Sequence, residues 1–148
     1  MSFNKLNFNT HISGAIQRCG YTEPTPIQTQ AIAPILERRD LLGLAQTGTG
    51  KTAAFILPTI QHLMESPGKH LRVLIIAPTR ELAEQINEFT RKIIQDTRLR
   101  SVAIYGGVSK QAQITRIRNG VDIVVACPGR LLDILNDNLK INIKDKKR

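Results

Sequence analysis

Four short apolar runs, partly β-branched, divide the chain and predict β-strands. They cover residues 41–45, 71–77, 101–105 and 121–126. The second and fourth runs are almost continuously apolar, which is typical of strands covered on both faces. Helical patterns lie between the runs, so the sequence predicts βαβ crossovers and a parallel sheet.

Amphipathic periodicity predicts the helices. Between residues 79 and 95, apolar side chains recur at spacings of four, three and four, opposite a charged face. A shorter helix is expected over 110–119. Ahead of the first strand, one helix is expected from about residue 11 to 19. Another begins at Thr25, with proline as its first helical residue, and is expected to kink or stop near Pro34.

Composition and charge narrow the class of ligand. The 148 residues correspond to one ordinary domain, and 21 Lys and Arg against 12 Asp and Glu give a formal net charge of +9. That surplus favours nucleic acid or phosphorylated ligands, with a solvated basic surface as the alternative. The 2 cysteines form no metal motif, and no apolar run resembles a signal peptide or a membrane span. We therefore expect a soluble, cytoplasmic protein.

A phosphate-binding loop is the strongest local signal. It is the run Ala45-Gln46-Thr47-Gly48-Thr49-Gly50-Lys51-Thr52, which follows the first apolar run and opens a helix. Its glycines allow backbone N–H groups to surround phosphate oxygens at the positive end of that helix, although Ala45 stands where GxxxxGK[ST] has glycine. Lys51 would contact the β and γ phosphates, and the Thr52 hydroxyl would coordinate Mg²⁺. The alternative is a glycine-rich turn without a ligand.

The segment before this loop points to a family. GYTEPTPIQ (residues 20–28), AQTGTGKT and PTRELA, in this order, resemble the N-terminal recombinase-like domain of the DEAD-box RNA helicases. The resemblance implies an α/β fold, a three-layer αβα P-loop NTPase domain with a mostly parallel sheet, which is incomplete here. It implies that Gln28 hydrogen-bonds adenine, that Phe3 stacks on its ring, and that Tyr21 and residues 46–52 complete an ATP or ADP site. Gln28 can also close a capping box with Thr25, and the two roles are compatible.

By the same resemblance, the loops after the later strands contact the RNA backbone. The residues concerned are Pro78, Thr79, Arg80, Gly106, Gly107, Pro128, Gly129 and Arg130. Arg80 is a cation at a helix N-terminus, which suggests a nearby anion, with an ion pair to Glu81 or Glu84 as the alternative. Cys127 replaces the Thr of the family's TPGR motif and removes a hydroxyl. We expect the loops after all four strands at the carboxyl edge of one sheet.

No adjacent Asp–Glu pair occurs in the sequence, so the DEAD motif is absent. We therefore expect the front part of an ATP-dependent RNA helicase, truncated before that motif and without the second recombinase-like domain. Such a chain would bind ATP or ADP with Mg²⁺, and RNA with little sequence preference, but would not hydrolyse ATP alone. We expect a monomeric parent protein and a tendency of the truncated chain to associate.

Two other functions fit part of the pattern. One is a small P-loop kinase, and the other is a non-catalytic basic RNA-binding module with a vestigial phosphate loop. Under the favoured interpretation, residues 1–40 form a helical segment carrying the GYTEPTPIQ motif. Residues 41–139 form a partial ATP-binding domain, and residues 140–148 form a frayed basic tail.

Overall fold

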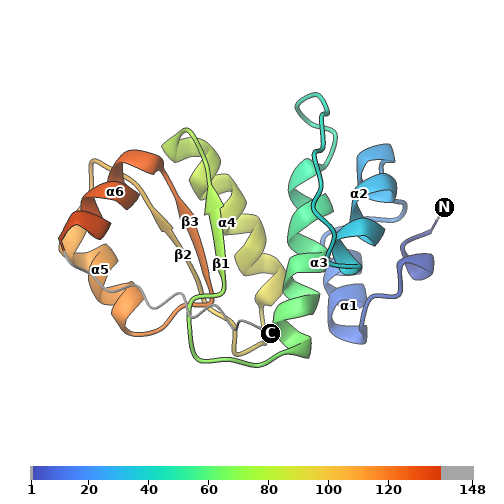
Figure 1. Cartoon of the computed structure of the whole chain (residues 1–148). Helices are drawn as coiled ribbons and strands as arrows, with labels where there is room; N and C mark the ends of the chain where they lie inside the picture. The colour runs from blue at the N-terminus through green and yellow to red at the C-terminus, as the bar shows by residue number, and fades with distance from the viewer. Residues whose placement is uncertain (1, 138–148) are drawn as a thin grey trace. The chain divides into compact units, whose positions relative to one another are not determined.

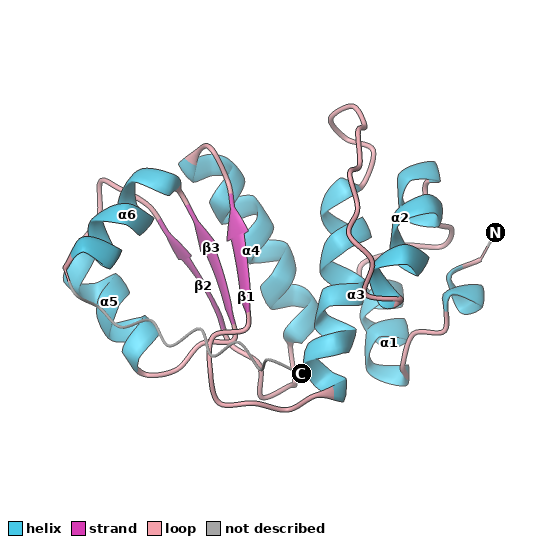
Figure 2. Ribbon diagram, in the orientation of Figure 1, coloured by secondary structure: helices cyan, strands magenta, loops and turns pink. Residues whose placement is uncertain are grey.

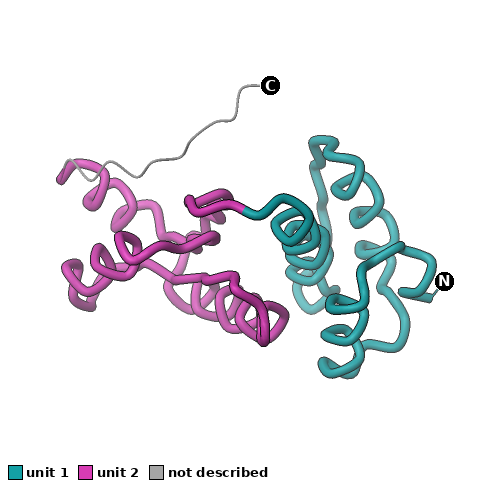
Figure 3. The backbone as a smooth tube through the Cα atoms, turned by 90° about the horizontal axis from the view of Figure 1, so that it is seen from below, with its two compact units in different colours: residues 1–67 teal, residues 68–148 magenta. Residues whose placement is uncertain are grey.

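The computed structural model describes residues 2–137, which fall into two compact units. Unit 1 covers Met1–Pro67 and unit 2 covers Gly68–Arg148 (Figure 3). The domain boundaries expected at residues 40 and 139 stay predictions, and the expected basic tail lies outside the described residues. No helix within residues 2–137 is long and apolar enough to cross a membrane.

Unit 1 is helical. Its elements are η1 (Phe3–Leu6), α1 (Thr10–Arg18), α2 (Pro26–Leu36) and α3 (Lys51–Glu65) (Figure 1). The two predicted N-terminal helices are thus confirmed, each with a polar N-cap: Asn9 accepts from the N–H of Ile12, and Thr25 from that of Gln28. Helix α2 packs against α3. The largest fully buried side chains of this unit are Ile12, Gln28, Ile32, Ile56, Leu57 and Ile60.

One expectation about unit 1 is wrong. Residues 41–45 form no strand, and Leu42 and Leu44 are each 87% exposed. A strand is stabilised by backbone hydrogen bonds to a neighbouring strand, and the elements described in unit 1 are all helices. Helix α2 ends at Leu36, two residues after Pro34, so the expected stop near this proline is confirmed. Because it ends within one turn of Pro34, little helix remains for the proline to disrupt.

Unit 2 contains a parallel sheet of three strands in the order β1-β3-β2 (Figure 2). The strands are β1 (Val73–Ile76), β2 (Ser101–Ile104) and β3 (Ile123–Ala126), and the helices are α4 (Arg80–Ile94), α5 (Lys110–Arg118) and α6 (Pro128–Asn136). In the register, Val73 and Ser101 both pair with Ile123. Three of the four predicted strands and both predicted amphipathic helices are therefore confirmed.

Helices lie on both faces of this sheet and form the three layers that the sequence predicts. Val102 and Val124 pack in one cluster with Ile114 of α5 and Ile134 of α6. Helix α4 contacts β2 and β3 from the other side, as Figures 1 and 2 show. Because side chains alternate along a strand, β3 is buried on both faces.

Strand β1 differs from β3, against the expectation from its apolar sequence. Leu74 and Ile76 pair in register with Val124 and Ala126, so they share the face that α5 and α6 cover over the other strands. They remain 42% and 51% exposed. Within the described part of unit 2, the helical layer on this face thus stops short of β1.

The amino edge of the sheet is held by Asp122. Its carboxylate accepts from Nη2 of Arg72 at 2.9 Å and from the backbone N–H of Arg100 at 2.9 Å. The carboxylate therefore joins the residue before β1 to the residue before β2. This arrangement holds the starts of all three strands in line.

Candidate nucleotide and nucleic-acid sites

The phosphate-binding loop in unit 1 leads directly into α3. Gly48 and Gly50 have φ values of 78° and 85°, a left-handed conformation that favours glycine. Gly50 is the N-cap of α3 and supplies no side-chain hydrogen bond to the first turn. The N–H groups of that turn are therefore not capped by a side chain, and together with the helix dipole they favour an anion at this end.

Side chains from the N-cap and first turn of α2 hold this loop. Thr25 Oγ1 donates to the carbonyl oxygen of Thr49 at 2.8 Å, and Gln28 Nε2 donates to that of Gly50 at 3.1 Å. Gln28 Oε1 also accepts from the backbone N–H of Thr25 at 3.0 Å, which confirms the capping box. The Gln28 side chain is only 2% exposed. Its amide therefore joins the start of α2 to the start of α3.

Gly50 must be glycine for a second reason besides its φ. A Cβ atom at this position would collide with Nε2 of Gln28, whereas a Cβ at Gly48 would meet nothing within 4 Å. The close approach of the Gln28 amide to the loop backbone is thus possible only without a side chain at position 50.

The Lys51 ammonium group is held by backbone carbonyl groups of the same loop. Nζ of Lys51 donates to the carbonyl oxygens of Ala45 and Gln46, the second at 2.6 Å. Thr49 Oγ1 also donates to the carbonyl oxygen of Gln46, at 2.7 Å. The ammonium group expected to contact phosphate is therefore already held inside the phosphate-binding loop.

Phe3 and Tyr21, the two aromatic residues expected near adenine, contact each other. Their ring centroids lie 6.3 Å apart with an interplanar angle of 31°. Phe3 is buried, and Tyr21 is partly exposed. The more accessible of the two residues is therefore Tyr21, although the family resemblance implies that Phe3 stacks on adenine.

In unit 2, the loops after β1, β2 and β3 all leave the carboxyl edge of the sheet, because the three strands are parallel. These loops carry the residues expected to contact RNA. The fourth loop expected at this edge, residues 45–52, lies in unit 1 and does not follow a strand. The prediction of one shared edge is therefore confirmed for the three loops of unit 2, and it stays a prediction for the phosphate-binding loop.

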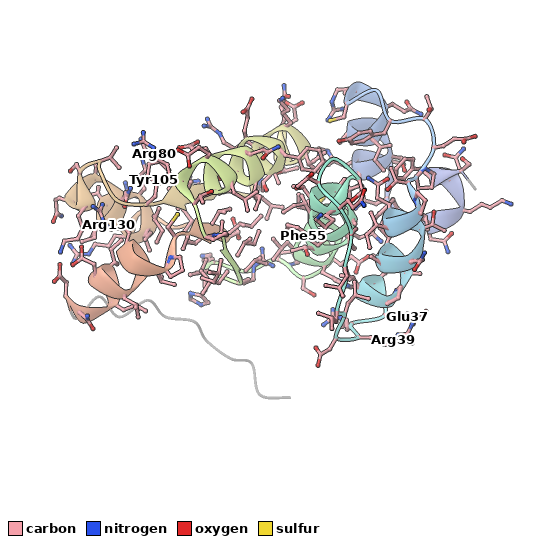
Figure 4. The ribbon with its side chains drawn as sticks, turned by 90° about the horizontal axis from the view of Figure 1, so that it is seen from above. Glu37, Arg39, Phe55, Arg80, Tyr105 and Arg130 are labelled. Carbon is pink, nitrogen blue, oxygen red and sulfur yellow. The ribbon has the colours of Figure 1, made fainter. Side chains whose placement is uncertain are left out.

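Arg80, at the start of α4, packs on an aromatic ring. Its guanidinium carbon lies 4.7 Å from the centroid of Tyr105, which follows β2, and Figure 4 shows the two side chains together. No ion pair joins Arg80 to Glu81 or Glu84 in the structure of residues 2–137. The Tyr105 hydroxyl donates to Glu84 instead. The sequence alternative of an Arg80 ion pair is therefore wrong.

The contact with Glu84 further favours the neutral form of Tyr105. Its hydrogen bond to that carboxylate, aided by desolvation, raises the pKa of the Tyr105 hydroxyl. Tyr105 therefore stays neutral near neutral pH and keeps its proton in the bond to Glu84. The neutral ring in turn holds the Arg80 guanidinium at the sheet edge.

Gln113 on α5 links the loops after β2 and β3. Its Nε2 donates to the carbonyl oxygen of Tyr105 at 3.0 Å, and its Oε1 accepts from Nη1 of Arg130 at 3.1 Å. The same Nη1 of Arg130 donates to the carbonyl oxygen of Val108 at 3.0 Å. Gln113 is buried, so the Arg130 guanidinium is held in place from the interior of the unit.

Cys127 is the N-cap of α6 and makes no side-chain hydrogen bond to that helix. Desolvation, together with the nearby charge of Glu81, raises the pKa of its thiol. The group is therefore a neutral thiol that neither caps the helix nor carries charge. The hydroxyl expected at this position in the family would be able to cap α6.

A comparison with protein families now bears on these two sites. Residues 25–147 match the family model of the DEAD/DEAH box helicases. This chain belongs to the DEAD/DEAH box helicase family. The match covers both the phosphate-binding loop of unit 1 and all three sheet-edge loops of unit 2.

Individual relatives agree with this assignment. The chain is 48% identical over 145 residues to DEAD-box ATP-dependent RNA helicase 30 of Arabidopsis thaliana, covering 93% of the chain and 24% of that protein. It is 46% identical over 144 residues to the probable ATP-dependent RNA helicase DDX23 of Homo sapiens, covering 92% of the chain and 18% of the relative. The chain thus spans less than a quarter of either relative.

A solved structure has the same fold. The crystal structure of a DEAD box protein from the hyperthermophile Methanococcus jannaschii matches with a TM-score of 0.87 at 36% identity, covering 93% of this chain and 38% of that one. The expected recombinase-like, incomplete α/β fold is therefore confirmed for this DEAD-box chain.

Within the DEAD-box chain, the residues expected to bind nucleotide all lie in unit 1 and those expected to bind RNA all lie in unit 2. Their binding roles stay predictions. Sequence reasoning missed the residues that support them, namely Thr25 as a partner of Thr49, Glu84 as the partner of Tyr105, and Gln113 as the partner of Arg130. Only the Thr25 position carried a sequence signal, its capping box, and that signal did not indicate the contact with the loop.

Proposed function

We propose that this chain is the part of an ATP-dependent RNA helicase that binds adenine nucleotide through unit 1 and the RNA backbone through unit 2. The observation that carries the proposal is the attachment of the phosphate-binding loop to the start of α2, through Thr25–Thr49 and Gln28–Gly50. A P-loop kinase has no need for this attachment. We also expect the parent protein to act in the cytoplasm as a monomer.

In this proposal, residues 46–52 hold the phosphates of ATP or ADP. The fit is supported by the uncapped N-terminus of α3 and by the open space around Gly48. Lys51 would exchange its carbonyl partners for phosphate oxygens, and the Thr52 hydroxyl, in the first turn of α3, is an oxygen ligand of the type that Mg²⁺ prefers. Bound Mg²⁺ would neutralise phosphate charge. Gln28 would position the loop while its remaining amide hydrogen contacts adenine.

The sheet edge of unit 2 would hold the RNA strand by its phosphates. Arg80 and Arg130 supply positive charge there, and each is fixed by a neighbour rather than by an acidic partner alone. Gly106, Gly107 and Gly129 leave the backbone accessible to sugar and phosphate, and Pro78 and Pro128 lie in the short segments that follow β1 and β3. Contacts of this kind position an RNA strand and do not distinguish its sequence.

We further propose that the 148-residue chain alone does not hydrolyse ATP at a meaningful rate. Phosphoryl transfer to water requires an oriented water molecule and positive charge on the transferred group, besides the bound metal. The sequence has no Asp–Glu pair to hold the metal and the water. Lys51 and Thr52 supply only part of what the reaction needs.

Nucleotide titration tests the first half of the proposal. Lys51→Ala should weaken ADP or ATP binding by about tenfold or more, equivalent to about 1.4 kcal/mol, because it removes the charge nearest the phosphates. Gln28→Ala should reduce the preference for ATP over GTP. Equal binding of ATP and GTP by the unmodified chain would show that the adenine assignment is wrong.

Fluorescence anisotropy with unrelated single-stranded RNAs at two salt concentrations tests the second half. Binding should weaken steeply with salt and vary little with sequence. Arg130→Gln should weaken binding to all the RNAs alike. Arg118→Gln is the matched control, because Arg118 is an exposed residue at the carboxyl-terminal end of α5. Salt-independent binding would contradict backbone recognition.

A further inference from the structure

A separate cavity of unit 2 lies at the other end of the strands from the RNA loops. Its volume is about 570 Å³, and Ser101, the first residue of β2, lines it together with the carboxyl-terminal half of α4 and the turn after α5. A volume of this size is typical of sites for small molecules. None of its lining residues is among those proposed above to bind nucleotide or RNA.

Two of the residues that line this cavity each have a buried polar atom without a hydrogen-bond partner. They are Oδ1 of Asn87, on α4, and Oγ of Ser101, and neither has a partner anywhere in the described chain. The Asn87 residue is only 7% exposed. Unpartnered buried polar atoms destabilise a fold, so each one requires an explanation. Apolar residues of similar size would fill the same space without this penalty.

The charges around the cavity are mostly positive. Arg91 on α4, Arg100 before β2 and Arg116 on α5 line it, with Asp96 as the one acidic residue of the lining. Arg91 and Arg116 form no ion pair within residues 2–137, whereas Arg100 donates to the carbonyl oxygen of Asn119 at 3.2 Å. Guanidinium groups bind phosphate and carboxylate through paired hydrogen bonds.

Arg91, Arg116 and Asn87 also line an adjoining cavity of about 340 Å³ beside Ala103 and Tyr105. The two cavities therefore follow the length of β2 between α4 and α5. Their shared residues place the unpartnered amide oxygen and two cations where both cavities meet.

We propose that this cavity binds a small molecule that carries a phosphate or carboxylate group and a hydroxyl or amine. The arginines hold the anionic group and the Ser101 hydroxyl donates to it. The Asn87 oxygen accepts from the hydroxyl or amine. This assignment explains why both polar atoms are kept in a buried place without partners, and why the cations around them are free of acidic partners.

Residue-resolved NMR titration of the full chain tests the proposal. The Lys51→Ala variant is used, so that anion binding to the phosphate loop does not contribute. The probes are glycerol 3-phosphate, glycerate and, as a control without an anionic group, glycerol. We expect saturable shifts of the Asn87 side-chain amide and the Ser101 backbone amide with the first two probes and none with glycerol. The stronger of the two probes identifies the anionic group.

Substitutions give the second readout. Ser101→Ala and Arg91→Gln should each weaken binding by about tenfold, and Arg98→Gln, an exposed arginine outside the lining, should not. Urea unfolding of Ser101→Ala and Asn87→Leu should show stability equal to or above that of the parent chain. Destabilisation of both would show that the polar atoms serve the fold. Absence of shifts, or the same shifts on adding single-stranded RNA, would also overturn the proposal.

Discussion

The two units of the chain hold their candidate sites by different means. In unit 1, the phosphate-binding loop is fixed by side chains, Thr25 and Gln28, from a segment more than 20 positions earlier. In unit 2, the loops are placed by the hydrogen-bonded strands that precede them, and side chains such as Gln113 only join one loop to the next. The first arrangement depends on single contacts, and the second is distributed over a sheet.

This difference predicts different responses to substitution. One change at a contact between the two segments of unit 1 should disturb the whole nucleotide site. A change at the loops of unit 2 should remain local, unless it affects the strands themselves. The following substitutions test this contrast, from the largest expected effect to the smallest.

Gly50→Ala should have the largest effect. Alanine is strained in the left-handed backbone conformation at this position, and its Cβ would also collide with Gln28. We therefore expect the free energy of unfolding to fall by about 2–4 kcal/mol and nucleotide binding to be lost. Gly48→Ala is the matched control, because it shares the positive φ but meets no atom within 4 Å, and should lose only about 1–2 kcal/mol. Urea unfolding and nucleotide titration measure both. Equal losses for the two variants would show that the Gln28 contact is unimportant.

Asp122→Ala should be the most damaging single change in unit 2. It removes the acceptor shared by Arg72 and Arg100, and we expect a loss of about 2–3 kcal/mol in the stability of unit 2. Hydrogen exchange of β1 and β3 measures it, and nucleotide binding by unit 1 should be unchanged. Asp133→Ala, which breaks only the half-exposed pairs with Lys110 and Arg130, should change stability by less than about 1 kcal/mol. A larger effect of Asp133→Ala would contradict the role given to the strand starts.

Cys127→Thr should raise stability. A threonine hydroxyl can accept from the first turn of α6, which lacks a side-chain cap, so we expect a gain of about 1 kcal/mol. RNA affinity should rise as well, because the hydroxyl can reach a phosphate oxygen. Cys127→Val has a similar shape without the hydroxyl and should give neither gain. Thermal unfolding of the two variants measures the change in stability, and fluorescence anisotropy measures the change in RNA affinity.

The smallest expected effect concerns the reactivity of Cys127. Because burial raises the pKa of its thiol, the folded state binds the proton more tightly than the unfolded chain. The associated stability is present at neutral pH and is lost as pH rises through the pKa of the folded thiol. Alkylation by iodoacetamide at pH 8 should therefore be several-fold slower in the folded chain than in urea. Equal rates would show that the thiol is not shielded.

Sequence patterns predicted local structure in this chain better than long-range structure. The capping box at Thr25 depends on neighbours within a few positions, and it is confirmed. The failed strand at 41–45 has the right residues, but a strand also needs a neighbouring strand, which composition cannot supply. For the same reason, the exposed face of β1 could not be distinguished from the buried faces of β3.

The side-chain links at the candidate sites were even less predictable. Gln113 and Glu84 look like ordinary polar residues of amphipathic helices, and only the fold brings them against Arg130 and Tyr105. Arg80 illustrates the limit clearly. A cation is unfavourable at a helix N-terminus, so the sequence indicates that Arg80 needs a stabilising contact. The contact that it makes, with the Tyr105 ring after the next strand, depends on topology.

The strand order β1-β3-β2 has one further consequence. It determines the order in which a bound RNA strand would contact the three loops. Adjacent strands lie about 4.8 Å apart, so the three loops are arrayed over about 10 Å, with the loop at 127–130 between the other two. An RNA strand crossing this edge would contact the loop after β1, then the loop after β3, and then the loop after β2. Photo-cross-links placed at residues 79, 107 and 129 should therefore map to successive points of one RNA in that permuted order, with residue 129 in the middle.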